Sequence, residues 1–99
     1  VVTPHVLRYV FGEEGAETRP STVADALNVE DSTEAIVRAV EEVRDALDLP
    51  SRLRDVDGPE PDDFDEVADA VVRDIFMPNA PDGLDATTDE LKGVLEEAW

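Results

Sequence analysis

The chain has 99 residues, of which 26 are Asp or Glu and eight are Lys or Arg, so its formal net charge is −18. This charge excludes nucleic acids and anionic membrane surfaces as partners, because both repel it. The chain has no cysteine, which excludes disulfides and thiol chemistry, and no apolar run approaches the ~18 residues of a membrane span. We therefore expect a single cytoplasmic domain over residues 1–99 with one modest core.

The first two predicted elements are a longer and a shorter helix. Thr3 and Pro4 are typical of an N-cap followed by proline at the first helical position, and they open a helix over "HVLRYVF". Gly12 and Gly15 bracket "GEEG" and predict a break. A short helix is then expected over "STVADALN", which begins at Ser21 and has its apolar residues on one side.

The strongest helical pattern is "DSTEAIVRAVEEVRDALD", residues 31–48. Asp31 and Glu34 have the spacing of a capping box, and Glu34 and Arg38 have the spacing and order of a favourable i,i+4 ion pair. Pro50 ends the helix. Its predicted apolar face consists of Ile36, Val40, Val43 and Leu47.

Two more helices are predicted in the second half of the chain. "PDDFDEVADAVVRDIFM", residues 61–77, has proline at its head and two aspartates suited to the positive end of the helix dipole. "TTDELKGVLEEAW", residues 87–99, opens with Thr87 and Glu90 at capping-box spacing. The inward faces are predicted to be Phe64, Val67, Ala68, Val71 and Ile75 in the first, and Leu91, Val94, Leu95 and Ala98 in the second. The sequence thus predicts an all-α domain of about five helices.

Few residues offer chemistry on their own. His5 is the only histidine, and a transition-metal site needs several converging ligands. We interpret it as a structural or surface residue, with a lone catalytic base as the alternative. Tyr9 and Trp99, the only tyrosine and tryptophan, are interpreted as packing residues rather than as part of a ligand site.

Residues 55–66, "DVDGPEPDDFDE", have carboxylates at positions 1, 3, 9 and 12, as a calcium-binding loop does. These carboxylates belong to Asp55, Asp57, Asp63 and Glu66. However, Glu60 occupies position 6, where the sharp turn of such a loop needs glycine. A solvated acidic turn that leads into a helix is the other interpretation, and the flanking prolines favour it.

The acidic residues are spread through every segment, and Lys92 is the only lysine. Dispersed carboxylates with almost no lysine are typical of proteins adapted to molar intracellular salt, as in haloarchaea. The alternative is an ordinary acidic protein, in which so complete an avoidance of lysine is rare.

Five landmarks follow one another along the chain. They are "TPHVLRY" (3–9), "LPSRLRDV" (49–56), "EVADAVVRD" (66–74), "NAP" (79–81) and "TxDEL…LEEAW" (87–99). In this order and spacing the chain resembles the C-terminal part of the iron-containing alcohol dehydrogenases, the family that includes lactaldehyde reductase, glycerol dehydrogenase and maleylacetate reductase. The resemblance covers essentially all 99 residues.

The resemblance implies a larger two-domain enzyme of the dehydroquinate synthase-like fold. Its N-terminal part would bind NAD(P), and its helical part would hold a divalent metal, iron or zinc, through an Asp and three His. In the family the last of these ligands, in an "HG" pair, precedes the "PHV" segment, so His5 corresponds to a non-ligand histidine. We therefore assign no catalytic, cofactor or metal residue to 1–99, and we expect this chain to be inactive without the upstream nucleotide-binding part.

The resemblance also gives expectations for two connecting segments. "LPSRLRD" is expected to link two helices, with Leu53 in the core and with Arg52 and Arg54 near helix C-terminal carbonyls. Solvation of the two arginines is the alternative. The segment after Asp74 is expected to approach the substrate cleft. Phe76 and Met77 are therefore the candidates for lining that cleft, and extension of the core is the alternative.

The chain departs from the family pattern at Val10, where Asn is usual, and at "NAPDG", where "NPR" is common. The second departure lies near the expected cleft and leaves the substrate open. A function of another class is a free-standing acidic interaction module, with calcium binding through 55–66. We also expect copies of the chain to form a homo-oligomer once salt screens their charge, because apolar helix faces are left uncovered.

Overall fold

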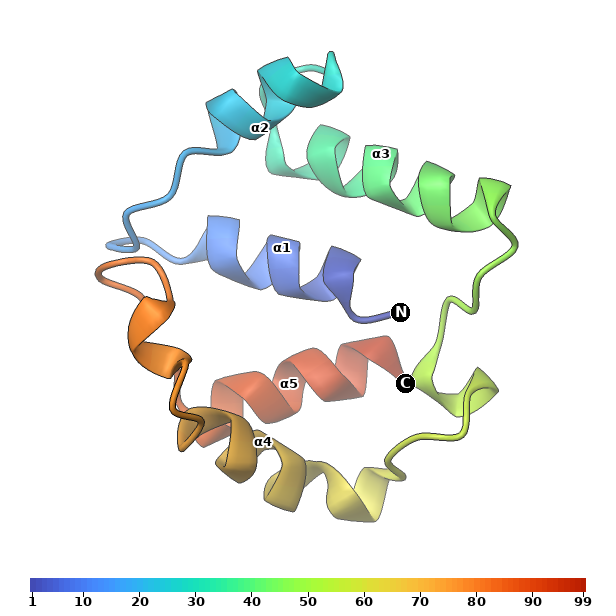
Figure 1. Ribbon diagram of the computed structural model, residues 1–99, viewed down its shortest axis with the longest axis vertical. Helices are drawn as coiled ribbons and strands as arrows, with labels where there is room; N and C mark the ends of the chain where they lie inside the picture. The colour runs from blue at the N-terminus through green and yellow to red at the C-terminus, as the bar shows by residue number, and fades with distance from the viewer.

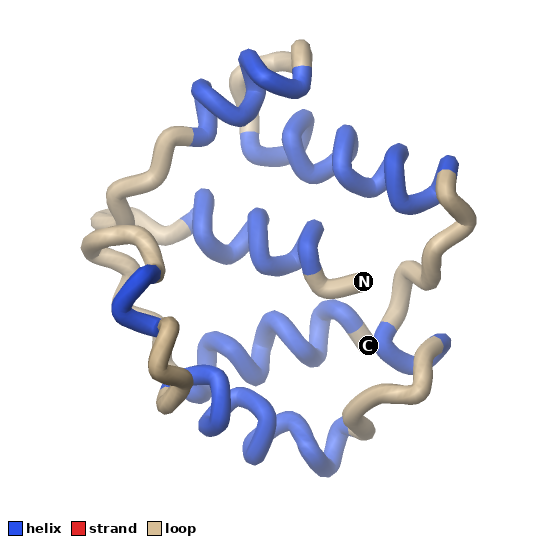
Figure 2. Tube along the Cα trace, viewed as in Figure 1, coloured by secondary structure: helices blue, strands red, loops and turns tan.

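The computed structural model describes residues 1–99 and consists of helices joined by short connections, with no strand (Figures 1 and 2). The α-helices are α1 (Thr3–Gly12), α2 (Pro20–Leu27), α3 (Thr33–Ala46), α4 (Phe64–Val72) and α5 (Thr88–Ala98). Single turns of 3₁₀-helix lie at Leu53–Asp55, Pro61–Asp63 and Met77–Asn79. The prediction of an all-α chain with five helices is confirmed.

The helices form a thin slab. Its extents are 38 × 34 × 19 Å, so the short dimension is only about two helix diameters. In Figure 1, α1 lies in the middle, with α3 and α2 on one side and α5 and α4 on the other. α1 packs on α3 and α5, α2 packs on α3, and α4 packs on α5. The fold is therefore two helical pairs joined through α1.

Side-chain caps begin two of the helices. The N–H of Glu90 donates to Oγ1 of Thr87 (3.2 Å), so the N-cap predicted for α5 is confirmed. In α3 the N–H of Ala35 donates to Oγ of Ser32 (3.1 Å). The predicted capping role of Asp31 is therefore wrong by one residue, because serine is as good a cap and stands next to the first helical position.

α1 begins one residue earlier than its pattern predicts. Thr3 is the first helical residue rather than the N-cap, and Val2, which precedes it, has no side-chain acceptor for the exposed N–H groups. Pro4 still lies in the first turn, where its missing N–H costs nothing, and its ring is buried. Packing of Pro4, rather than a cap, fixes this end of the helix.

α4 is shorter than predicted. It ends at Val72, and the carboxylate of Asp74 then accepts a hydrogen bond from the N–H of Phe76 (2.7 Å), which stabilises a turn in place of another helical turn. Phe64 and Ala68 are buried as expected, but Ile75 is 82% exposed. Its predicted place on the inward face is therefore wrong.

The core is small. Eight residues are buried: Pro4, Ala24, Ile36, Val37, Leu53, Phe64, Ala68 and Ala98. One cluster, formed by Leu53, Phe64 and Ala98, is extended by Val1 and Trp99 from the two ends of the chain. The predicted burial of Leu53 is confirmed.

Arg54 contacts the carboxyl end of α5, so the expectation of a helix C-terminal carbonyl near this residue is met, although which helix would supply it was not predicted. Its Nε donates to the carbonyl oxygen of Trp99 (2.5 Å), and its guanidinium lies 5.6 Å from the centre of the Trp99 ring. The ring in turn meets Phe64 edge to face, with 6.0 Å between centroids. A cation is stabilised both at a helix C-terminus and over an indole face. Through Arg54 and Trp99, the segment between α3 and α4 therefore links the start of α4 to the end of α5.

Much apolar surface remains uncovered. Ten large hydrophobic side chains are exposed, among them Val43 and Leu47 of the predicted apolar face of α3. Only Ile36 and Val37 of that helix are buried. With so few buried residues the hydrophobic stabilisation of the slab is modest, and its exposed apolar faces are suited to contact with another surface.

Two loops that are distant in sequence meet at a glycine. Gly83 has φ +80°, and a Cβ on it would lie 1.8 Å from the carbonyl oxygen of Gly15. The N–H of Glu17 donates to the carbonyl of Asp82 (2.5 Å) at the same contact. Only glycine fits this approach without displacing the backbone.

Candidate functional site

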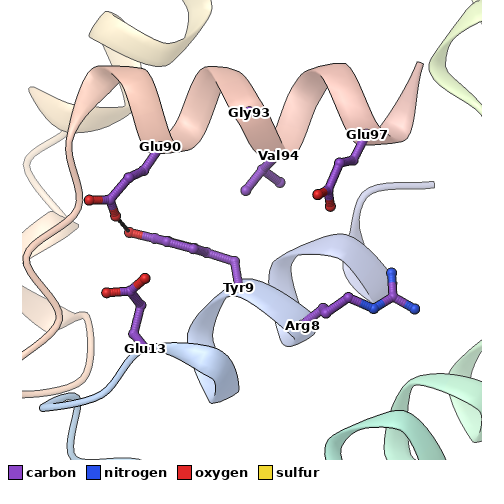
Figure 3. A pocket seen from close by; sticks show the side chains of 7 residues that line it. All are labelled: Arg8, Tyr9, Glu13, Glu90, Gly93, Val94 and Glu97. Atoms are coloured by element: carbon purple, nitrogen blue, oxygen red, sulfur yellow. Dashed lines mark hydrogen bonds between the residues drawn. The ribbon is translucent and has the colours of Figure 1, made fainter.

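Charged side chains converge in a hollow between α1 and α5 (Figure 3). We call it the polar hollow, and its volume is about 270 Å³. α1 contributes Arg8 and Tyr9, and α5 contributes Glu90 and Glu97. Residues seven apart on α5 lie on one face of the helix, which places both carboxylates opposite α1.

Tyr9 spans the polar hollow. Its hydroxyl donates to Oε2 of Glu90 at 2.5 Å (Figure 3). Burial, the hydrogen bond to Glu90 and the nearby charges of Glu13 and Asp85 all raise the pKa of Tyr9. The phenol therefore stays protonated at neutral pH and serves as a donor that joins α1 to α5, not as a base.

His5 lies beside the polar hollow without a hydrogen-bond partner. Its Nδ1 is buried and is 3.9 Å from Oε2 of Glu97, too far for a hydrogen bond. Burial, followed by the positive charge of Arg8, lowers the pKa of His5. The imidazole is therefore neutral at neutral pH.

Arg8 joins α1 to α3 on the other side. Its Nε lies 3.0 Å from Oε1 of Glu34, and this hydrogen bond lowers the pKa of Glu34. The predicted pair of Glu34 with Arg38 does not form, because the carboxylate turns to α1 instead. Both side chains of the Arg8–Glu34 pair are substantially exposed, so the pair orients the helices more than it stabilises them.

A second hollow, which we call the apolar groove, runs between α1 and α4 with α5 beneath. It comprises two neighbouring cavities of about 230 and 160 Å³, which share part of their lining. Both cavities are lined by Val6 of α1, Val71 of α4, and Leu91 and Val94 of α5. α1 and α4 both pack on α5, and the space between them is left open.

The two cleft candidates fall at different places relative to the apolar groove. Met77 lines the larger cavity. Phe76 does not line either cavity and is 69% exposed. Met77 is half-buried and Phe76 is exposed, and neither is among the buried core residues.

The carboxylates of 55–66 do not form a calcium cage. Asp63 accepts a hydrogen bond from the N–H of Glu60 (3.0 Å), and the Glu60 side chain returns a contact to the Asp63 backbone. This capping box starts the turn that leads into α4. No three His, Asp or Glu residues in 1–99 lie close enough together to hold a metal ion.

Further comparisons add no relative. No family model matches the chain, and comparison with curated proteins and with solved structures gives no match. None of the helices is both long enough and apolar enough to cross a bilayer.

Sequence reasoning missed the polar hollow. It treated Tyr9 as a packing residue, whereas the hydroxyl binds Glu90 from 81 positions away. The available signal was the placement of Glu90 and Glu97 seven residues apart, which predicts a polar stripe on α5. Nothing in the sequence identifies α1 as the helix that faces this stripe.

Proposed function

We propose that this chain forms the C-terminal helical part of a metal-dependent NAD(P) alcohol dehydrogenase of the dehydroquinate synthase-like fold, which oxidises an alcohol or performs the reverse reduction. The support is the role of the landmark residues in the packing. Pro4 of "TPHVLRY" and Leu53 of "LPSRLRDV" are buried, and Arg54 binds the carbonyl of Trp99 in "LEEAW". Three of the five segments that carry the resemblance thus contribute to the packing of the slab.

The uncovered surface at one end of α3 supports a docked upstream part. We call it the α3 patch, and it consists of Val43, Leu47 and Leu49, each more than half exposed. Val1 lines a cavity of about 170 Å³ beside Val43 and Leu49. A nucleotide-binding part that precedes Val1 would therefore reach the α3 patch without a long connection.

The residues of 1–99 do not themselves fit a divalent metal, because no three ligand side chains converge. In this proposal the metal and NAD(P) are held by the upstream part. Bound there, the metal would supply Lewis-acid polarisation of the alcohol oxygen and NAD(P)⁺ would supply the hydride acceptor. The contribution of this chain is packing and shape, with Phe76 and Met77 as candidates for contact with the substrate.

The test is alcohol-dependent reduction of NAD(P)⁺ with Fe²⁺ or Zn²⁺ present. We expect activity from the complete gene product and none from the 99-residue chain. A complete product that reduces neither cofactor with any of a panel of alcohols would refute the assignment, and activity of the short chain would refute its dependence on the upstream part. Leu47→Asp in the complete protein should weaken docking, and Glu42→Gln is the matched surface control.

Specificity tests the cleft candidates separately. In the complete protein Phe76→Ala and Met77→Ala should change kcat/KM for small and bulky alcohols by different factors, because they alter the shape of the cleft. An equal loss across all substrates would mean that the side chains act through stability alone.

A further inference from the structure

The apolar groove and the polar hollow adjoin at two shared residues. Tyr9 of α1 and Val94 of α5 line both the polar hollow and the larger cavity of the groove. Tyr9 is the only residue of that larger cavity with a polar side-chain atom, and the smaller cavity is lined by hydrophobic residues alone. A hydrocarbon chain in the groove would therefore keep an attached polar group outside it, on the side of the polar hollow.

The polar hollow carries an excess of negative charge. Its lining includes the carboxylates of Glu13, Glu90 and Glu97 and one cation, Arg8. The Arg8 guanidinium is already bonded to Glu34 (3.0 Å), and none of the three carboxylates forms an ion pair with Arg or Lys. A cation in the polar hollow would therefore meet negative charge that nothing else offsets, whereas a carboxylate or phosphate would be repelled.

Two of these carboxylates lie where the hollow adjoins the groove. Figure 3 shows Glu90 of α5 and Glu13, which follows α1, on either side of the Tyr9 hydroxyl. Burial, the hydrogen bond to Glu90 and then the charges of Glu90 and Glu13 raise the pKa of Tyr9, so both carboxylates are close enough to act on it. The hydroxyl donates its proton to Glu90, and its oxygen remains an acceptor. A protonated amine, which has three N–H donors, suits this group of acceptors.

The size of the apolar groove limits the hydrocarbon part of such a ligand. A helix with its side chains is about 10–12 Å across, whereas the two cavities hold only about 230 and 160 Å³. A cavity of about 150 Å³ holds a six-carbon ring, so the larger cavity has room for a chain of about six to nine carbons. A polyamine would bury a second charge among hydrophobic residues, so the groove favours a single amine at one end of the chain.

We propose that the apolar groove and the polar hollow together bind a primary alkylammonium ion of about six to nine carbons. Its hydrocarbon chain lies in the larger cavity against Val6, Leu91 and Val94, and its ammonium group lies in the polar hollow near Glu13 and Glu90. The site does not depend on the proposed dehydrogenase function, because residues of this chain alone line both hollows.

Calorimetric titration of the 99-residue chain with primary alkylammonium chlorides from butyl to decyl tests the proposal. The lowest KCl concentration that gives full helical content by circular dichroism is used. Each added methylene should tighten binding about fourfold while the groove fills, and the affinity should level off near nine carbons with one ligand per chain. An affinity that keeps rising with length would mean partition onto exposed apolar surface. That result, or no binding at all, overturns the proposal.

The head group separates the effect of charge from that of hydrocarbon. Octylammonium should bind at least about tenfold more tightly than octanol, and octanoate more weakly than octanol. A fourfold increase in KCl should narrow the gap between octylammonium and octanol, because salt screens the carboxylates. Octanol that binds as tightly as octylammonium would overturn the ammonium site. An acetylated Leu-Lys-Leu amide that binds more tightly than octylammonium would overturn the free amine in favour of a lysine-bearing peptide.

Paired variants locate the two parts of the ligand. Glu13→Gln should weaken octylammonium binding at least about threefold without changing octanol binding, whereas Glu14→Gln, which removes a neighbouring carboxylate outside the polar hollow, should have a smaller effect. Ala80→Phe should abolish binding of both ligands by filling the larger cavity. Ala46→Phe, at an exposed position of α3 outside both cavities, should leave binding unchanged. Equal effects within either pair, with helical content intact by circular dichroism, would overturn the proposal.

Discussion

Raising KCl from 0.1 M to 2 M should strongly stabilise this chain, because few of its acidic groups are paired. Four carboxylates form ion pairs with Arg or Lys, which leaves 22 of the 26 without one. The four are the pairs Arg8–Glu34, Arg44–Asp45, Arg73–Asp69 and Lys92–Asp65. Charges on opposite faces of the slab, which is 19 Å thick, are largely screened from one another at 0.1 M salt, so the repulsion that matters is between neighbours on the same face.

The size of the effect follows from Coulomb's law. Two charges 10 Å apart in water repel by about 0.4 kcal/mol. Screening leaves about a third of this at 0.1 M salt and a few per cent at 1 M. With about two such neighbours per unpaired carboxylate, the repulsion is on the order of 3 kcal/mol at 0.1 M and a few tenths at 1 M. Because the unfolded chain retains part of it, we expect a net gain on the order of 2 kcal/mol, or about 10 °C in Tm.

Circular dichroism at 222 nm, followed through thermal melts across the KCl series, measures this gain. The triple variant Glu14→Gln, Glu42→Gln and Asp57→Asn removes three exposed carboxylates that make no ion pair. It should be more stable than the parent at 0.1 M and should respond less to salt. A helical signal and Tm that do not change between 0.1 M and 2 M would refute the adaptation to molar salt. The family resemblance would survive that result, because it depends on other residues.

Three further predictions concern single sites. Gly83→Ala should lower the free energy of unfolding by at least about 2 kcal/mol, because the added Cβ forces the loops at Gly15 and Gly83 apart. Gly93→Ala, which has open space around it, should raise the free energy of unfolding by up to about 1 kcal/mol because alanine favours the helix. Urea unfolding of both variants in 2 M KCl measures these changes. Calcium titration should show no stoichiometric micromolar binding at 55–66, and such binding would favour the interaction module over the dehydrogenase. Because the pKa of His5 is lowered in the fold from 6.5, the unfolded chain takes up its proton first as the pH falls. Stability should therefore drop below about pH 6.5 and be flat above it, and His5→Gln should lessen the drop in melts at pH 7.5 and pH 5.5.

The sequence predicted the five helices and the cap of one of them. The spacing of Thr87 and Glu90 identified the start of α5, and the resemblance at "LPSRLRD" predicted the burial of Leu53. Prediction failed at Ile75. The spacing of apolar residues continues the helical pattern to this position, but α4 ends at Val72 and the carboxylate of Asp74 accepts a hydrogen bond from the N–H of Phe76. A side-chain oxygen that accepts a hydrogen bond from the backbone N–H two residues later competes with the helical hydrogen bonds. The spacing of apolar residues carries no information about this competition.

The polar contacts could not be predicted in the same way, because they join helices whose packing the sequence leaves open. Glu34 has Arg38 as its helical neighbour, yet it binds Arg8, 26 residues away. An exposed i,i+4 pair is worth only a few tenths of a kcal/mol, so a small change in packing decides which cation the carboxylate meets. The packing of α1 on both α3 and α5 makes that choice, and it creates the polar hollow and the apolar groove together. α1 therefore gives this chain its candidate sites, although no residue of α1 suggests by itself what it will face.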